Sequence, residues 1–183
     1  MKGVIFTLLA TLAIFGGVVL DSCKPDKCKH VNCAYGGVCK DGKCECQVGY
    51  EGEHCETVTR KKFMGIYSVN ENGTLSGAAQ YTISIEAGEK INEVIIKNFQ
   101  NLLQTSVVKG TVYKDTLYLD DNQPFADGTR TVSGWGYITD NNPLNQHYYQ
   151  HATVTMYYRV TTLSTGQVNE YGSGGALPSV WSK

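Results

Sequence analysis

The residues with the clearest chemical potential are cysteines, which make up 7 of the 183 residues and gather near the start of the chain. Six of them are separated by four, five, four, one and eight residues: Cys28, Cys33, Cys39, Cys44, Cys46 and Cys55. Cysteine thiolates bind soft metal ions or oxidise to disulfides. A zinc site typically uses Cys-x-x-Cys pairs or histidines at ligand spacing, and the cluster has neither. The spacing therefore favours disulfides, which form in oxidising compartments.

Other reactive residue types do not combine into a catalytic or metal site. Asp120 and Asp121 are neighbours, so on a strand their carboxylates would point to opposite faces, and we expect a solvated turn there. His147 and His151, four residues apart, would lie about 13 to 14 Å from each other along a strand, too far to share a metal ion. The sequence has no recognisable Ser/His/Asp arrangement and no phosphate-binding glycine loop. We therefore expect no enzymatic activity, no cofactor and no bound metal.

Turn-forming residues accompany the cysteines in a specific order. Gly36-Gly37 precede the third cysteine of the six, Asp41-Gly42 lie between the third and fourth, and Gly49 to Gly52 precede the last. With the cysteine spacing, this pattern resembles an EGF-like domain over residues 23–56, most similar to the compact repeats of tenascin-type matrix proteins. The resemblance implies three disulfides: Cys28–Cys39, Cys33–Cys44 and Cys46–Cys55. A module of this size buries too little apolar area to fold alone, so cross-links that restrict the unfolded chain must stabilise it.

Calcium-binding members of the EGF family carry acidic or amide side chains just before the first cysteine. Here that stretch is Lys24-Pro-Asp-Lys27, with one carboxylate between two lysines. Such a stretch is a poor site for a hard cation, so we expect no calcium.

The chain begins like an export signal. Residues 1–22 combine a basic start at Lys2, an apolar run and small or polar residues before Cys23. Leu20 to Cys23 resembles the lipobox of bacterial lipoproteins, which implies cleavage before Cys23 and lipidation of its thiol. Lipidation would leave an even six cysteines for pairing. The alternative is a retained membrane helix, because the apolar run of eighteen residues reaches the lower limit for crossing a bilayer.

After the cysteines, the sequence pattern changes to that of an antiparallel β domain. Residues 57–62 are polar and charged and are expected to form a linker, and in 63–165 apolar and polar residues alternate with a period of two. We expect seven strands, at 65–69, 81–86, 94–99, 107–113, 116–120, 131–138 and 153–160. Turn signals such as Asn72-Gly73 and Asp127-Gly128 separate them. The glycine-containing residues 166–183 are expected to form a flexible C-terminal tail.

This series of short strands favours a mainly β protein with an antiparallel meander barrel or a sandwich, since both protect strand edges. Phe63-Met-Gly65-Ile-Tyr67 resembles the opening strand of lipocalin-like (calycin) barrels. The whole layout, with an export signal, an EGF-like module and a meander barrel, resembles surface lipoproteins of Bacteroidetes-type bacteria. That resemblance implies a protein lipid-anchored to the outer membrane at the cell surface.

The balance of charges excludes one class of partner. Lys and Arg number 16 against 17 Asp and Glu, for a formal net charge of -1. Nucleic-acid binding usually requires a clear basic patch, and none stands out. We therefore expect no nucleic-acid partner.

Aromatic residues are the remaining sign of binding. Five fall on the more polar side of expected strands and are the candidates for a ligand or partner face: Tyr113, Tyr118, Trp135, Tyr137 and Tyr157. Such amphipathic rings stack on sugars or dock proteins at low entropy cost. Aromatic residues also favour strands for packing reasons alone, so the pattern permits either explanation.

Three functions remain open. An adhesion protein, with its barrel raised from the membrane by the EGF-like module to bind protein or glycan, predicts a packed barrel interior and an exposed aromatic patch. A lipocalin-like carrier of a small apolar ligand predicts an interior too large for its side chains to fill. A eukaryotic secreted, extracellular adhesion protein would leave Cys23 as an odd thiol and make Asn72 a glycosylation acceptor.

Overall fold

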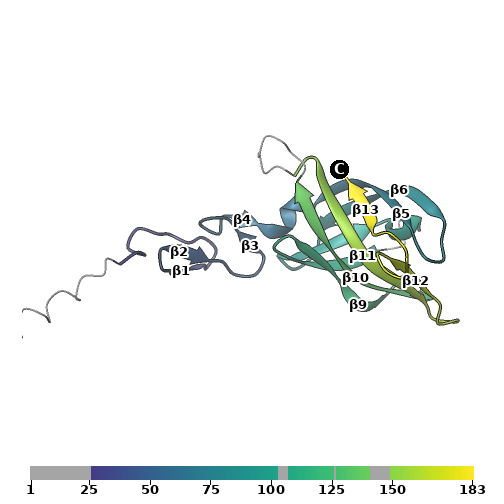
Figure 1. Ribbon diagram of the computed structural model, residues 1–183. Helices are drawn as coiled ribbons and strands as arrows, with labels where there is room; N and C mark the ends of the chain where they lie inside the picture. Colours follow the sequence, from purple (N-terminus) through teal and green to yellow (C-terminus); the bar gives the residue numbers. More distant parts are fainter. Residues whose placement is uncertain (1–25, 103–106, 126, 141–148) are drawn as a thin grey trace, which may run out of the picture.

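The structure, a computed structural model, describes residues 26–102, 107–125, 127–140 and 149–183. A small disulfide-bonded module extends from one end of a larger β-barrel (Figure 1). The expected signal at 1–22, the lipidation candidate Cys23 and His147 lie outside the described residues. Within the described ranges, no helix is long and apolar enough to cross a membrane.

The N-terminal module consists of two small antiparallel pairs. Strands β1 (Val38–Lys40) and β2 (Lys43–Glu45) form a hairpin, and β3 (Tyr50–Glu51) pairs with β4 (Thr57–Val58). Asp41 and Gly42 both have positive φ, +52° and +84°, as the tight hairpin turn requires. The disulfides are those that the resemblance implies: Cys28–Cys39, Cys33–Cys44 and Cys46–Cys55. Covalent loops rather than a large core therefore stabilise this module.

Residues 57–62, expected to form a linker, are instead part of the fold. Strand β4 belongs to the N-terminal module, and the 3-10 turn η1 (Thr59–Lys62) follows it directly. Arg60 donates hydrogen bonds to the carbonyl oxygens of Gly88, Lys90 and Glu93 on the barrel. The two modules are thus joined without a free connecting segment.

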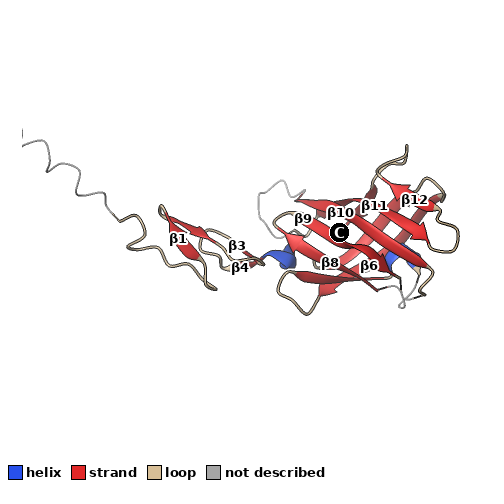
Figure 2. Ribbon diagram, turned by 90° about the horizontal axis from the view of Figure 1, so that it is seen from below, coloured by secondary structure: helices blue, strands red, loops and turns tan. Residues whose placement is uncertain are grey.

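The barrel is a closed antiparallel meander of eight strands. After η1, the described elements of the chain are β5 (Gly65–Asn72), β6 (Ala78–Ala87), β7 (Glu93–Lys97), η2 (Phe99–Asn101), β8 (Val107–Tyr113), β9 (Thr116–Pro124), β10 (Arg130–Asp140), β11 (Ala152–Thr162), β12 (Val168–Tyr171) and β13 (Ser179–Ser182). All of these strands except β12 belong to the closed ring. Neighbours in sequence pair from β5 to β11, and β13 closes the barrel between β11 and β5 (Figures 1 and 2). The short β12 is an additional strand that pairs with the other half of β11.

The seven expected strands are all present, and the fold is a barrel rather than a sandwich. The prediction of a flexible tail at 166–183 was wrong. Those residues form β12 and β13, and the side chain of Trp181 is only 1% exposed in the barrel interior. Residues 179–182 form a strand because β13 closes the barrel. Without β13, the facing edges of β5 and β11 would have no partner and the barrel interior would open to water.

The alternation of residues along each strand explains which side chains enter the core. In β10, Val132, Gly136 and Ile138 are buried, whereas Trp135 and Tyr137 between them are exposed. Successive side chains on a strand point to opposite faces, so one register places Val132, Gly136 and Ile138 inside and the two aromatic residues outside.

Large side chains fill the barrel interior. The largest fully buried residues are Trp181, Tyr67, Phe63 and Phe99. Phe99 comes from η2, where the chain turns inward after β7, and its ring meets Tyr158 and Trp181 edge to face at 5.1 and 6.1 Å. Such contacts are typical of a well-packed aromatic core.

A hydrogen-bonded carboxylate also lies inside the barrel. Glu71 is buried and accepts hydrogen bonds from the hydroxyl groups of Tyr81 at 2.8 Å, Tyr158 at 2.5 Å and Ser179 at 2.8 Å. The side chain of Gln100 donates to the Tyr158 hydroxyl as well. These bonds offset the cost of burying a polar group and connect β5, β6, β11, β13 and the η2 segment.

Candidate binding face on the barrel

The five aromatic residues expected to form a partner face all lie on the outside of the barrel. Tyr113, Tyr118, Trp135 and Tyr137 are exposed, with 46% of Trp135 accessible, and Tyr157 is partly exposed. Each points away from the core because its neighbours in the strand point inward.

Strand register brings three of these side chains into direct contact. Trp135 lies opposite Tyr118 on one side and Tyr157 on the other. The rings of Trp135 and Tyr157 stack at 4.9 Å with an interplanar angle of 16°. Tyr137 lies 6.4 Å from Tyr157 and 6.5 Å from Trp135. We call Tyr118, Trp135, Tyr137 and Tyr157 the aromatic ridge.

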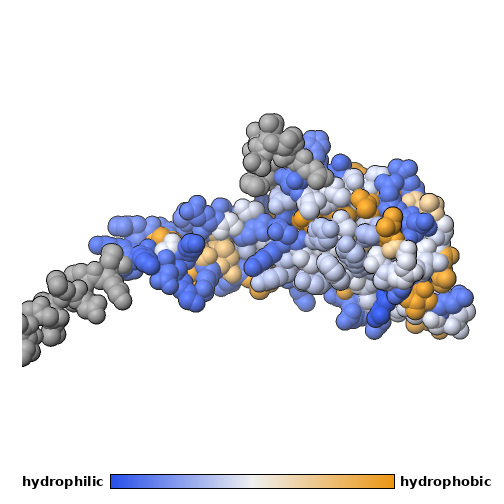
Figure 3. All heavy atoms as spheres, in the orientation of Figure 1, coloured by the Kyte–Doolittle hydropathy of each residue, from blue (hydrophilic) through white to orange (hydrophobic). Residues whose placement is uncertain are grey.

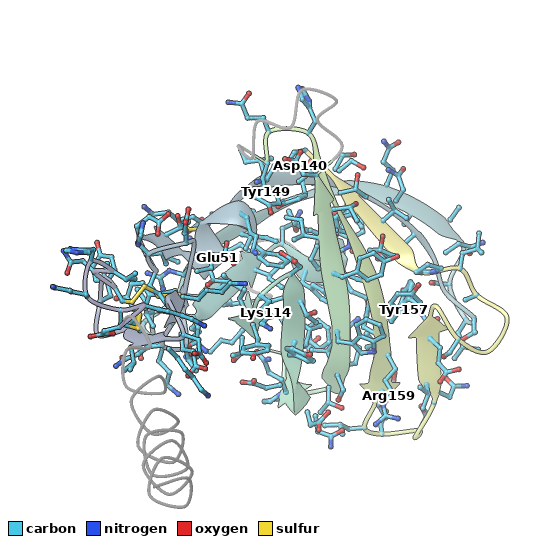
Figure 4. The ribbon with its side chains drawn as sticks, turned by 60° about the vertical axis from the view of Figure 1, so that its left-hand side comes forward. Glu51, Lys114, Asp140, Tyr149, Tyr157 and Arg159 are labelled. Carbon is cyan, nitrogen blue, oxygen red and sulfur yellow. A yellow bond between two sulfur atoms is a disulfide. The ribbon has the colours of Figure 1, made fainter. Side chains whose placement is uncertain are left out.

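Tyr113 is set apart from the ridge. It pairs with Thr116, which in turn pairs with Tyr137, so a threonine separates the two tyrosines. The Lys114 ammonium group lies 5.6 Å from the centroid of the Tyr113 ring. Figure 4 shows Lys114 near the junction with the N-terminal module, whereas Tyr157 lies farther along the barrel. Tyr113 therefore belongs to the surroundings of the junction.

A shallow groove of about 400 Å³ adjoins the ridge. Trp135 and Tyr157 contribute to its lining, together with the charged side chains of Asp121, Arg159 and Glu170. Tyr157 and Arg159 lie along the same outer side of β11 (Figure 4). The groove thus places charges of both signs beside the aromatic rings.

The sequence did not identify these charged groove residues. Asp121 was expected in a solvated turn, but it lies within β9, where the register against β10 shifts between Val132 and Gly134. Asn122 has a φ of +53°, and its N–H donates to the Ser133 hydroxyl at 2.7 Å. This β-bulge alters the local direction of the strand next to the groove. A positive φ at an asparagine is a weak sequence signal, so only the structure reveals it.

Gly172 supports the ridge from the side of β12. It has a φ of +85°, and a Cβ atom at this position would overlap the ring of Tyr157. The absence of a side chain therefore lets the backbone pass directly against Tyr157.

The environment of the ridge also affects its hydroxyl groups. Desolvation raises the pKa of Tyr157, and the neighbouring Tyr137 raises that pKa further, partly through a side-chain hydrogen bond. The Tyr157 hydroxyl therefore stays protonated at neutral pH and is available for hydrogen bonding.

A separate ionic cluster connects the two modules. The buried Lys62 ammonium group forms ion pairs with Glu51 at 2.8 Å and Asp115 at 2.6 Å. Burial alone would lower the pKa of Lys62, but the hydrogen bonds to Asp115 and Glu51 outweigh it, so the pKa is raised. The cluster links β3 of the N-terminal module to the β8–β9 turn of the barrel.

The described residues do not contain three or more His, Cys, Asp or Glu side chains grouped so as to hold a metal ion. Glu51 and Asp115 are instead bound to Lys62.

Comparisons with known proteins identify the N-terminal module. The sequence model of the Teneurin-like EGF domain matches residues 28–58, the segment that holds the three disulfides and β4. No curated protein matches the chain. One matching solved structure is a protein of unknown function from Bacteroides ovatus, with 10% identity and a TM-score of 0.40. That match covers 66% of this chain and 41% of the other, so the chain spans less than half of that structure. The chain therefore carries an EGF-like domain, of the kind found in exported proteins, ahead of a closed antiparallel barrel.

Proposed function

We propose that this chain is a non-enzymatic, lipid-anchored adhesion protein of the cell surface, whose barrel binds a protein partner through the aromatic ridge. The observation that carries the proposal is the exposed stack of Trp135 on Tyr157, on the outside of a barrel with a filled interior. Exposed clusters of large aromatic residues are costly in water and commonly mark interaction sites.

The filled interior disfavours the alternative of a lipocalin-like carrier. A carrier needs a lumen that its own side chains leave open. Here Phe99, Tyr158 and Trp181 pack together inside the barrel. We accordingly propose that the chain binds its partner on the outer wall of the barrel.

The arrangement of the rings favours a protein over a glycan. Sugars stack on free ring faces, but Trp135 and Tyr157 each cover a face of the other. A ridge of Trp and Tyr with an adjacent Arg has the composition of protein interaction hot spots. The charged groups of Arg159, Asp121 and Glu170 would then pair with complementary charges around the centre of the contact.

The EGF-like domain fits the role of a spacer. Its direct connection to η1 and the ionic cluster at Lys62 hold it against one end of the barrel. An anchor at Cys23 would precede this domain in the chain, and the barrel follows it. The several acyl chains of a lipoprotein are enough for stable anchoring without a membrane-spanning helix.

The binding proposal is tested with immobilised extracellular proteins and a glycan array, probed with the wild-type chain, W135A, Y157A and I66A. Ile66 is a matched control, since it is an exposed apolar residue on β5, which is not adjacent to β9 or β10 in the barrel. We expect a protein partner that binds the wild type and I66A and loses at least about tenfold affinity with W135A or Y157A. If the chain bound only glycans, its partner would be a sugar and the proposal of a protein partner would be wrong. Equal binding by all four chains would overturn the role of the ridge.

Anchoring is tested separately by mass spectrometry of the chain extracted in detergent from its own host. We expect a chain that begins at Cys23 and carries acyl groups on it. An unmodified Cys23 or an intact leader would contradict the lipid anchor without affecting the binding test. A glycan on Asn72 would indicate the secreted eukaryotic alternative.

A further inference from the structure

The barrel contains an exposed strand edge. Strand β6 pairs with β5 from Ala78 to Ile85, but with β7 only from Ser84 to Ala87. Among the described residues, no strand pairs with Ala78–Ile83 on the β7 side. Within the part of the chain that the structure describes, the first half of β6 is thus paired with another strand on one side only.

The direction of the backbone groups can be assigned from two hydrogen bonds. The Gly88 N–H donates to the Glu93 carbonyl oxygen at 2.9 Å, and the side-chain amide of Asn98 donates to the Thr82 carbonyl oxygen at 2.7 Å. Backbone groups alternate in direction along an antiparallel strand. The even-numbered residues of β6 therefore direct their N–H and C=O groups away from β5. At Ala78 and Gln80 these groups point toward the exposed edge, and both residues are exposed.

The core explains why β7 stops short. Asn98 adopts a left-handed conformation with a φ of +60°, which ends the strand. The chain then turns inward so that Phe99 is buried beside Tyr158 and Trp181. Burial of this ring removes the partner that β6 would otherwise have along Ala78–Thr82.

The edge also lacks the usual protection against pairing. Natural edge strands commonly carry lysines, prolines or bulges that prevent contact with another strand. Residues 72–85 contain no charged residue and no proline. A groove of about 550 Å³ lies alongside, and its lining includes the exposed Ile66, Thr82 and the Glu86–Lys97 ion pair, whose opposite charges balance each other. An uncharged edge can meet an identical copy without repulsion.

We infer that β6 pairs with β6 of a second copy of this chain, in an antiparallel arrangement around a two-fold axis at Gln80. In this register Gln80 faces Gln80 of the second copy, and Ala78 faces Thr82 of the second copy. The backbone groups of Ala78 and Gln80 that now point to solvent become paired, as in other cases of strand addition. The Thr82 carbonyl oxygen, which already accepts from the Asn98 side chain, has a second lone pair for the Ala78 N–H of the second copy. The contact uses a surface distinct from the aromatic ridge and needs no other partner.

The first test measures self-association of the full, disulfide-bonded chain by sedimentation equilibrium in detergent, for the wild type, Q80P and Q80A. Proline removes the Gln80 N–H, and an edge position is where a strand tolerates proline. Q80A removes the side chain but keeps the N–H. We expect Q80P to weaken dimerisation by about thirtyfold, since one hydrogen bond is lost in each copy, and Q80A to change it by less than about threefold. Association through the N-terminal apolar run would be equal in all three chains and would overturn the inference.

A pair of oppositely charged variants at Gln80 tests the inference even if Q80P folds poorly. Q80K and Q80E each place like charges opposite each other in the homodimer, whereas a one-to-one mixture places opposite charges there. We expect each variant alone to be mainly monomeric and the mixture to dimerise. Hydrogen exchange at the amides of Ala78 and Gln80 should slow only in the associating samples. Failure of the mixture to dimerise, or a wild-type chain that stays monomeric at all concentrations, would exclude the β6 dimer.

Discussion

Trp135 and Tyr157 face each other across β10 and β11, and their rings stack at 4.9 Å on the outer wall of the barrel. Two features therefore determine the shape of the ridge. One is the strand register that pairs these residues, and the other is Gly172, whose backbone lies against the Tyr157 ring. Rings that already pack on each other lose little further freedom on contact, which would lower the entropy cost of the proposed binding.

Gly172→Ala should disturb the ridge specifically. A methyl group there would overlap the Tyr157 ring, and it would also strain a backbone with a φ of +85°. Gly175→Ala is the matched control, because its φ is +90° but a Cβ atom would meet nothing within 4 Å. We expect both variants to lose about 1 kcal/mol of unfolding free energy from backbone strain, and G172A to lose further stability and partner binding. Urea denaturation of the two variants checks this, and equal losses would show that the Tyr157 contact is unimportant.

Lys62→Ala should weaken the junction between the modules. The Lys62 side chain is only 5% exposed and binds two carboxylates, although Asp115 is largely exposed. Because the pair is partly solvated, we expect a loss of about 2 kcal/mol, below the range for a fully buried pair. Lys97→Ala removes the Glu86 ion pair of 2.7 Å between half-exposed side chains, so it should destabilise the chain less than Lys62→Ala. Thermal unfolding and limited proteolysis near residues 57–62 measure the difference, and K62A behaving like K97A would contradict a stabilising role for the junction.

Alkaline pH should unfold the barrel. Burial raises the pKa of Tyr67, Tyr81 and Tyr158 above the ordinary value of 10.0, and the pKa of Lys62 is raised above 10.5. A group with a raised folded pKa contributes its full stability below the unfolded pKa and loses it as pH rises above that value. We therefore expect the free energy of unfolding to fall from about pH 10 upward.

The Tyr67 hydroxyl provides the control for this pH dependence. It donates to the Phe63 carbonyl oxygen at 2.8 Å, so Tyr67→Phe should cost about 1 kcal/mol at neutral pH. Above pH 10 the Tyr67 hydroxyl of the unfolded wild type ionises, whereas phenylalanine does not ionise. The difference in unfolding free energy between Tyr67→Phe and the wild type should therefore narrow above pH 10. Urea titrations at several pH values measure this, and a constant difference would show that Tyr67 ionisation is not coupled to unfolding.

Reducing agents should unfold the EGF-like domain and leave the barrel folded. All six paired cysteines lie between residues 28 and 55, and the barrel has none. Removal of a native disulfide from a small domain typically costs 2 to 5 kcal/mol, whereas the barrel has its own large core. Thermal scans with and without reductant should retain the barrel transition. Loss of both modules in one reduced transition would mean that the barrel depends on the EGF-like domain.

Much of the barrel was predictable because the signals are local. The alternation in 131–138 identifies both the strand and the outward direction of Trp135 and Tyr137, since side chains alternate between faces whatever the rest of the fold. The final strand was not predictable in this way. Its four residues, Ser179–Ser182, are too short for a clear pattern, and glycines precede them. What stabilises β13 is its two neighbours, β5 and β11, which are distant in sequence.

By itself, the sequence determined the seven main strands and the outward-facing aromatic residues, because both follow from the period within a short segment of chain. The cysteine spacing and the glycines around it carried the resemblance to an EGF-like domain, and that resemblance implied the three disulfides. Only the tertiary structure decided which aromatic residues meet, which charges join them, how the barrel closes and which edge of β6 stays exposed. Those features depend on strand register, on the bulge at Asn122 and on the inward turn at Phe99. They arise from packing between segments far apart in the chain, where competing interactions must be satisfied together.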